Sequence, residues 1–295
     1  MYSRRNFIKQ ASLLIAGGVI APNILSSCKG AAKASGSSKY LGLQLYSLRD
    51  MVRDEGIRKV LETVAAMGYN SLEAASYGDG KLYGLEPTEL KKIIDDLGMK
   101  LTSSHIGHNL TDDHSADMAW WNKAIEAHNA AGVKYLIMPS SPLNGAGATL
   151  DNVKRYGEYF NEIGLISAGA SIGFGYHNHN FEFANKIDGV PVYDFLLENT
   201  SPDHVGFQLD VFWIKKGGYE PLDYMKKYSK RIKTLHIKDE TVIGADNTVS
   251  YKDVFEQAYA NGIKDWYVEV ERYIGTPVED VSESAKYLLN ASFTK

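Results

Sequence analysis

The chain has 295 residues, of which 44% are hydrophobic and 23% charged, values typical of a soluble globular protein. Its formal net charge is −4, and the first 27 residues carry three basic side chains and no acidic one, so the rest of the chain is more acidic still. A nucleic-acid-binding protein normally shows a basic excess, so we expect no nucleic-acid partner. The single cysteine, Cys28, excludes an intramolecular disulfide and a cysteine-based zinc site.

The N-terminal segment is predicted to direct export. Arg4 and Arg5 precede an apolar run over residues 11–24, which is too short for a membrane span and typical of a secretory signal. The paired arginines resemble a twin-arginine signal, and the sequence Leu-Ser-Ser-Cys ending at Cys28 resembles a bacterial lipobox. An ordinary amphipathic helix is the alternative. We expect a signal peptide over 1–28, lipidation of Cys28, a flexible tether over 29–38 and a membrane-anchored, periplasm-facing protein.

Strand-like and helix-like segments alternate through the rest of the chain, and Gly follows several helices as a C-cap signal. Strands are predicted near 40–46, 71–75, 100–104, 134–138, 173–177, 205–210, 232–237 and 266–271. Helices are predicted near 55–67, 87–97, 115–131, 150–168, 192–198, 222–228, 251–260 and 278–289. Eight such units predict a single (β/α)8 TIM barrel over 39–295. A doubly wound sheet is disfavoured because neither a G-x-G-x-x-G nor a P-loop motif is present.

Polar residues collect where the predicted strands end, which is where the active site of such a barrel lies. They are Gln44 and Tyr46 on the first strand, Glu73 on the second, His105 on the third, His177, Asn178 and His179 on the fifth, Gln208 and Asp210 on the sixth, His236 and Lys238 on the seventh, and Glu269, Glu271 and Arg272 on the eighth. Side chains alternate along a strand, so residues two apart share a face. Titratable side chains facing a barrel interior are costly unless they are paired or bound to a metal.

Four of these residues are predicted to bind one divalent metal. His177, Asp210, His236 and Glu271 stand at the same end of four consecutive strands. Imidazole and carboxylate together suit Mn²⁺, Co²⁺, Fe²⁺ or Zn²⁺. A single His or Asp at a strand end is more often a structural residue. The same holds for the other polar residues: Glu73 alone suits an ion pair, His105 alone suits packing, and Lys238 suits a loop ion pair with its neighbour Asp239. The prediction therefore depends on their coincidence. No role is predicted for His114, His128 or His204.

At these residues the chain resembles the xylose isomerase-like TIM-barrel superfamily of sugar phosphate isomerases and epimerases. The resemblance rests on GLQLYS at 42–47, Ser104-His105, YHNHN at 176–180 with Phe181-Glu182-Phe183, Leu209-Asp210, HIKD at 236–239 and VEVE at 268–271. It implies a metal held by Glu, Asp, His and Glu on strands five to eight. His177 stands where the family has the first Glu, Glu182 is the nearest carboxylate, and Glu269 is the alternative to Glu271.

The resemblance implies an isomerase or epimerase acting on a sugar or keto-sugar through a metal-stabilised enediolate. The candidates for proton transfer are Glu73, His105, His179, Lys238 and Glu269. The candidates for substrate binding are Gln44, Tyr46, Asn178, Gln208 and Arg272. A phosphorylated sugar is disfavoured because no Gly-rich phosphate cradle is evident.

Three alternatives remain open. A keto-sugar lyase or dehydratase would use the same metal for β-elimination, for example on a 3-keto-glycoside. A lipid-anchored sugar-binding protein would need no turnover. An endonuclease IV-like nuclease is disfavoured by the acidic charge. The oligomeric state is not predicted.

Overall fold

A computed structural model describes residues 39–246 and 248–295. The predicted signal peptide, the lipidation of Cys28 and the tether over 29–38 lie outside these residues. None of the helices in the described part of the chain is long and apolar enough to cross a membrane.

Eight parallel strands of the described chain form a closed barrel, which confirms the predicted fold. They are β1 (Gly42–Gln44), β2 (Ser71–Ala74), β5 (Lys100–His105), β6 (Tyr135–Met138), β7 (Gly173–His177), β10 (Val205–Asp210), β11 (Ile232–Lys238) and β12 (Trp266–Glu269). They follow one another around the barrel in chain order, and β1 pairs with β12 to close it. The carboxyl ends of all eight strands therefore lie at one end of the barrel.

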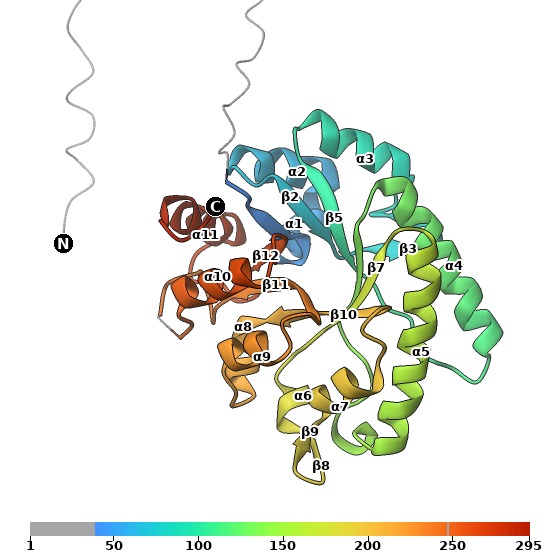
Figure 1. Cartoon of the computed structure of the whole chain (residues 1–295). Coiled ribbons are helices and arrows are strands. Elements are labelled where there is room, and N and C mark those ends of the chain that lie inside the picture. The colour runs from blue at the N-terminus through green and yellow to red at the C-terminus, as the bar shows by residue number, and fades with distance from the viewer. Residues whose placement is uncertain (1–38, 247) are drawn as a thin grey trace, which may run out of the picture. The chain divides into compact units, whose positions relative to one another are not determined.

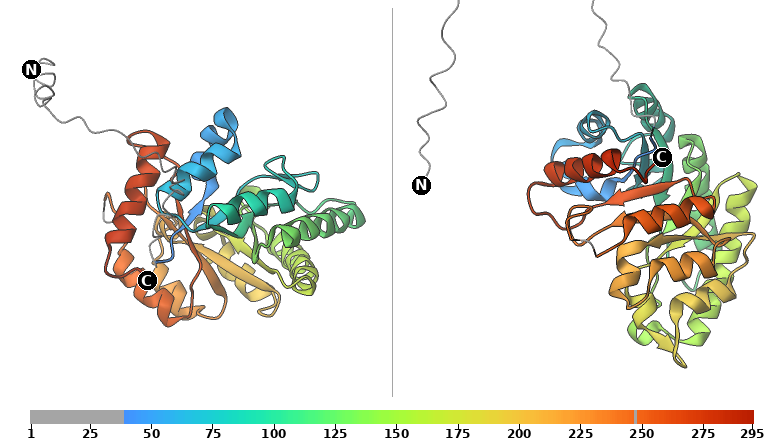
Figure 2. Two further views of the ribbon diagram at one scale, coloured as in Figure 1. Left: turned by 90° about the horizontal axis from the view of Figure 1, so that it is seen from above. Right: turned by 60° about the vertical axis from the view of Figure 1, so that its left-hand side comes forward.

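Helices follow the strands and lie outside them (Figure 1; Figure 2). They are α1 (Arg49–Glu55), α2 (Ile57–Ala66), α3 (Pro87–Asp96), α4 (His114–Ala131), α5 (Leu150–Gly169), α7 (Val192–Asn199), α8 (Val211–Lys216), α9 (Pro221–Lys227), α10 (Tyr251–Ala260) and α11 (Pro277–Asn290). Their apolar faces are buried: Val60, Leu61 and Val64 of α2 are fully inaccessible to solvent. Each such side chain stabilises the fold by about 1.5–3 kcal/mol. The start of α11 is fixed by a capping box between Thr276 and Glu279.

The closure of the barrel brings two backbones very close together. Gly42 pairs with Tyr267, and a Cβ atom at Gly42 would lie 2.1 Å from the carbonyl oxygen of Trp266. A glycine is therefore required where β1 meets β12.

The ends of two strands differ from the prediction. β1 stops at Gln44 because its side chain accepts a hydrogen bond from the Tyr46 backbone N–H (3.1 Å) and begins a 3₁₀ helix, η1 (Leu45–Leu48). β12 stops at Glu269, two residues before the predicted end. The helix predicted over 55–67 is preceded by α1 and begins after Gly56, whose φ of 83° breaks the helical path.

Several short elements lie in the loops beyond the strands. They are the hairpin of β3 (Tyr77–Gly78) and β4 (Lys81–Leu82), the hairpin of β8 (Lys186–Ile187) and β9 (Val190–Pro191), and helix α6 (Phe181–Ala184). Asp79 and Gly80 both have positive φ at the tip of the first hairpin, which is the pattern of a tight two-residue turn. This hairpin follows β2 at the active-site end of the barrel.

Candidate active site at the carboxyl ends of the strands

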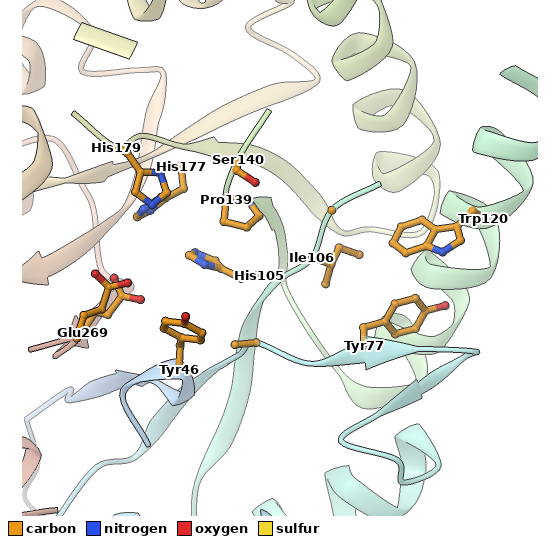
Figure 3. Close-up of a pocket in the computed structure, with 13 residues that line it drawn as sticks. Tyr46, Tyr77, His105, Ile106, Trp120, Pro139, Ser140, His177, His179 and Glu269 are labelled. Carbon is orange, nitrogen blue, oxygen red and sulfur yellow. The ribbon is translucent and has the colours of Figure 1, made fainter. Parts of the chain in front are cut away.

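A cavity of about 460 Å³ opens among the loops that follow the strands. Its polar lining includes His105, His177, His179, Glu269 and Glu271, and Tyr46 stands at its edge (Figure 3). The sequence-predicted residues therefore converge on one hollow, but they divide into a group that faces the cavity and a group buried beneath it.

The carboxylate of Glu73 is the centre of the buried group. Its Oε1 accepts hydrogen bonds from Ser103 Oγ (2.6 Å) and Gln208 Nε2 (2.7 Å). Its Oε2 accepts from Gln44 Nε2 (2.7 Å) and His236 Nε2 (2.5 Å). All five side chains are fully buried. We call this set the Glu73 hub; it joins β1, β2, β5, β10 and β11 across the barrel.

The Glu73 hub keeps its carboxylate charged. Burial alone would raise the pKa of Glu73, but the neighbouring His105 and His236 lower it below its ordinary value. An ionised carboxylate only accepts hydrogen bonds, so every neighbour in the hub must present a donor to it.

That requirement sets the orientation of Gln208. Its Nε2 donates to Glu73, so its Oε1 faces the imidazoles of His177 (Nδ1, 3.0 Å) and His105 (Nε2, 2.7 Å). Both rings must then donate to this oxygen. Burial lowers the pKa of both histidines, which keeps them neutral. The lone pair of His177 Nε2 is left free and can bind a metal. The lone pair of His105 Nδ1 is also left free and can take a proton.

His236 lies between two carboxylates. Its Nε2 donates to Glu73, and its Nδ1 lies 3.3 Å from Glu269 Oε2 and 3.9 Å from Asp210 Oδ2. Burial alone would lower the pKa of His236, but the charges of Glu73 and Glu269 raise it to about 10. When no other cation is bound, the positive charge of the His236 imidazolium thus offsets the negative charge of the buried carboxylates.

Asp210 has one satisfied oxygen and one free oxygen. Its Oδ1 accepts from the backbone N–H groups of Phe212 (2.9 Å) and Trp213 (2.7 Å) at the start of α8. Its Oδ2 is buried and has no hydrogen-bond partner. Burial raises the pKa of Asp210 to about 7. Asn178 holds the strand end by accepting from the Asp210 N–H (3.0 Å). The carboxylate is therefore fixed with one oxygen left for another ligand.

Two overlapping groups among the described residues have the composition and spacing of a metal site. The donor atoms of Asp210, His236 and Glu269 lie within 4.8 Å of one another, and so do those of His105, His177 and His236. The unpartnered Asp210 Oδ2 and the lone pair of His177 match the needs of a divalent cation. The residues present therefore fit such an ion.

Glu271 lies outside both groups, whereas Glu269, the alternative ligand from the same strand, belongs to one of them. β12 ends at Glu269, so the alternation of side chains along a strand does not extend to Glu271. Its carboxylate instead pairs with Lys238 Nζ at 2.6 Å. Glu269 also pairs with Lys238 (2.8 Å), but its Oε2 lies 3.3 Å from His236 Nδ1 as well. Glu269 is therefore the carboxylate from β12 that belongs to the candidate metal-binding group with Asp210 and His236.

Lys238 is a buried cation behind Glu269 and Glu271, which line the cavity. Its ammonium contacts the two carboxylates of Glu269 and Glu271 and lies 5.4 Å from the ring centre of Trp213. Burial alone would lower the pKa of Lys238, but the carboxylates raise it above its ordinary value. The side chain is thus a charged acid beside the candidate metal ligands.

Other candidate residues have different positions from those predicted. Tyr46 lies on η1 and is 43% exposed at the cavity edge. Gln44 and Gln208, predicted to bind substrate, are buried in the Glu73 hub. Asn178 is buried against the Asp210 backbone. Arg272 does not line the cavity and pairs with Glu240 on the surface, because it lies three residues past the end of β12.

His179 faces the cavity from the loop after β7. Its ring is 5.0 Å from that of His177, and its buried Nδ1 has no hydrogen-bond partner. Burial lowers the pKa of His179 to about 4, so the ring is neutral at pH 7. Its backbone N–H donates to Glu182 Oε2 (2.8 Å), and the other oxygen of this carboxylate, Oε1, accepts from the Tyr176 hydroxyl (2.6 Å). Glu182 thus positions the His179 loop from outside the cavity.

Three residues of the site lacked a predicted role. Ser103 is a donor in the Glu73 hub, and Tyr77 and Trp120 line the cavity. The Asp79-Gly80 turn signal could have revealed the hairpin that carries Tyr77. Trp120 gives no such signal, since an aromatic residue on an amphipathic helix is most simply part of its packed face.

The comparisons with known proteins agree with this architecture. A family profile, xylose isomerase-like TIM barrel, matches residues 61–291. A crystal structure of a sugar phosphate isomerase/epimerase from Parabacteroides distasonis is 35% identical, with a TM-score of 0.81 over 88% of this chain and 100% of that chain. A structure of L-ribulose 3-epimerase shares the fold at 14% identity, with a TM-score of 0.69 over 84% of this chain and 93% of that chain.

Curated relatives are inosose dehydratases. The one from Geobacillus kaustophilus is 24% identical over 61% of this chain and 61% of its own length. The one from Geobacillus thermodenitrificans is 23% identical over 43% of this chain and 51% of its own length. The chain thus spans about half to three-fifths of these two relatives. The family match covers most of the chain, and the protein belongs to the xylose isomerase-like TIM-barrel family.

Proposed function

We propose that the protein is a divalent-metal-dependent isomerase or epimerase that moves a proton next to the carbonyl of a sugar or keto-sugar. The observation that carries the proposal is the buried Oδ2 of Asp210, which has no hydrogen-bond partner and faces His236 Nδ1 and Glu269. A buried carboxylate oxygen without a partner is costly, and a bound cation removes that cost.

The proposed ligands are Asp210 Oδ2, His236 Nδ1, a carboxylate oxygen of Glu269 and His177 Nε2. When bound, a divalent ion supplies the polarisation of the substrate carbonyl. The hub holds two of the ligands: Glu73 accepts from the far nitrogen of His236, and Gln208 accepts from the far nitrogen of His177. Such outer hydrogen bonds fix the tautomer and ring orientation of a ligating histidine. The zinc atom in the solved IOLI protein of this fold supports a metal of this class.

Proton transfer is assigned to the neutral imidazoles and to Lys238. His179 and His105 are uncharged at pH 7 because burial lowers the pKa of each, so either ring can accept a proton. The Lys238 ammonium contacts Glu269 and can donate one. The candidate bases and the acid thus come from different parts of the barrel end: His105 from β5, His179 from the loop after β7, and Lys238 from β11.

A dehydratase or lyase is the second candidate. His177 in place of a carboxylate removes one general base from β7, while the buried Lys238 supplies an acid suited to protonating a departing oxygen. The match to inosose dehydratases points the same way. The two reactions differ in their products, because an isomerase leaves the substrate mass unchanged and an elimination releases water or an alcohol.

Elemental analysis of the purified full chain, beside Asp210→Ala, His236→Ala and Glu271→Gln, tests the proposal. We expect one divalent transition metal per wild-type chain, its loss in the first two variants and its retention in Glu271→Gln. A screen of sugars and keto-sugars read by product mass then separates the two reactions. A wild-type chain that stays metal-free after incubation with Mn²⁺, Co²⁺, Fe²⁺ and Zn²⁺ would contradict the enzymatic mechanism and favour a sugar-binding protein.

We also propose that the chain is exported and anchored through a lipid on Cys28. The paired arginines and the lipobox-like sequence support this proposal. Labelling of cells with radioactive palmitate should mark the wild-type protein and leave Cys28→Ala unlabelled. Labelling of both, or of neither, would contradict the anchor.

A further inference from the structure

The cavity has two ends of different chemistry (Figure 3). His177, His179 and Glu269 lie at one end, where the proposed reaction takes place. Tyr77 and Trp120 lie at the opposite end of the view, and His105 and Ile106 lie between the two groups. The proposed chemistry uses none of the side chains at the aromatic end. A substrate that occupies only the polar end leaves that part of the cavity unfilled.

The aromatic end is held in place by residues outside the cavity. The ring of His108 stacks on that of Trp120, with centres 4.9 Å apart and planes 18° apart, and Tyr77 meets Trp120 edge-on at 5.4 Å. His108 does not line the cavity, so it supports the indole from behind. Asp117, which is 1% exposed, accepts from Thr111 and pairs with His108 Nε2 at 2.7 Å.

This arrangement gives the cavity a fixed aromatic surface. Trp120 is half-buried, and its stacking on one side limits the rotation of its ring. A rigid ring binds a partner with little loss of side-chain entropy. The electron-rich face of an aromatic ring attracts positively polarised C–H groups and the edges of other rings. The cavity of about 460 Å³ also lies within the range of sites that hold ligands larger than one small ring.

We propose that the substrate is a glycoside of a keto-sugar, in which the reacting sugar, with its keto group, occupies the histidine end and a second ring on the glycosidic oxygen packs on Trp120. This inference rests on the proposed function, because it takes the reacting sugar to lie at the proposed metal ligands. The second ring is either a sugar, through its C–H face, or an aryl group, through its π face; both present the flat apolar surface that the indole binds. Trp120 and Tyr77 are then specificity residues rather than catalytic ones.

Calorimetric titration of the full chain with matched probes tests the proposal. The one-ring probe is methyl β-D-glucopyranoside, and the two-ring probes are cellobiose, trehalose and phenyl β-D-glucopyranoside. We expect at least one two-ring probe to bind about tenfold more tightly than the one-ring probe. In Trp120→Ala this preference should fall to within about twofold, with the one-ring affinity unchanged. Trp120→Phe, which keeps an aromatic face, should retain most of the preference.

The outcomes separate this proposal from the proposed function. A gain with the disaccharides assigns the aromatic end to a second sugar, and a gain with the phenyl glycoside alone assigns it to an aryl group. The absence of any gain from a second ring, or a gain that survives in Trp120→Ala, overturns the inference and leaves the metal and turnover results intact. If the proposed function fails instead, the chain lacks metal and turnover while the Trp120-dependent preference remains.

Discussion

His236 donates from Nε2 to the Glu73 carboxylate across 2.5 Å, while its Nδ1 faces Asp210 and Glu269. One imidazole thus connects a fully buried carboxylate on β2 with the proposed metal ligands. Because the Glu73 carboxylate is ionised and can only accept, the proton stays on Nε2 and the other nitrogen is directed to the cation.

Glu73→Gln should weaken metal binding by roughly 10- to 100-fold, because the amide no longer fixes the tautomer of His236. A metal-chelator competition titration measures this change. Ser103→Ala is the matched control, since it removes a hydrogen bond to the other oxygen of the same carboxylate and leaves His236 in place. Equal metal affinity in the wild type and Glu73→Gln would show that the hub does not act on the metal.

Lys238→Met should separate metal binding from turnover. The ammonium competes for the Glu269 carboxylate, so its removal should leave metal affinity equal or higher. Turnover should fall by about 100-fold or more, because the general acid is lost. Metal content and turnover number, measured on the same preparation, test both parts. Loss of the metal in Lys238→Met would instead indicate that the lysine only holds the ligands in position.

His128 should make the folded state sensitive to mild acid. Burial lowers its pKa from 6.5 to about 4, and its ring is held by Ala124 O (2.7 Å) and Ser104 Oγ (3.0 Å). The unfolded chain binds the proton first, so this contribution is complete above pH 6.5 and is lost as pH falls towards 4. The shift corresponds to roughly 3 kcal/mol.

Denaturant unfolding of the wild type and His128→Gln at pH 7.5 and pH 4.5 measures this effect. The variant should show a smaller loss of unfolding free energy between the two pH values. Other titrating groups contribute equally to both proteins, so the difference between the two losses isolates His128. Identical losses would show that this histidine is not the cause.

Gly42→Ala should prevent or strongly weaken barrel closure. The new Cβ would lie 2.1 Å from a backbone oxygen of β12, and neither backbone can move without breaking the β1–β12 pairing. We expect a loss of about 3 kcal/mol or more of unfolding free energy. Gly107→Ala is the control: its Cβ would meet Met138 at an ordinary 3.7 Å, and its stability should change by less than about 0.5 kcal/mol.

The barrel was predictable from the sequence because its signals are local. Apolar runs marked the strands, seven of which were predicted to end in polar residues, and Gly68, Gly98 and Gly132, which all have positive φ, marked helix ends. Asp210 and His236 were predicted to lie together because both stand at the carboxyl ends of neighbouring strands, and they are in register on β10 and β11. The alternation of side chains within a strand does not extend to Glu271 because β12 ends at Glu269, and no sequence pattern shows where pairing to a neighbouring strand stops.

The Glu73 hub and the aromatic end of the cavity were harder to predict from the sequence, for a different reason. Gln44 and Gln208 look like substrate-binding residues because they are polar and near strand ends, yet both point to Glu73. Which side of a strand end faces the cavity depends on the tilt of strands distant in sequence. Trp120 and Tyr77 come together only when α4 packs beside the hairpin β3–β4.

The hairpin β3–β4 is separate from the barrel sheet. It leaves the barrel after β2 and returns before α3, and its turn at Asp79-Gly80 makes no contribution to the pairing of the barrel strands. Its tip, residues 78–81, can therefore be changed, whereas Leu82 is packed in the core and the Tyr83 hydroxyl accepts from the Ala75 N–H just after β2 (2.8 Å). A library confined to residues 78–81 would vary the loop next to Tyr77 at the aromatic end of the cavity and leave the Glu73 hub in place.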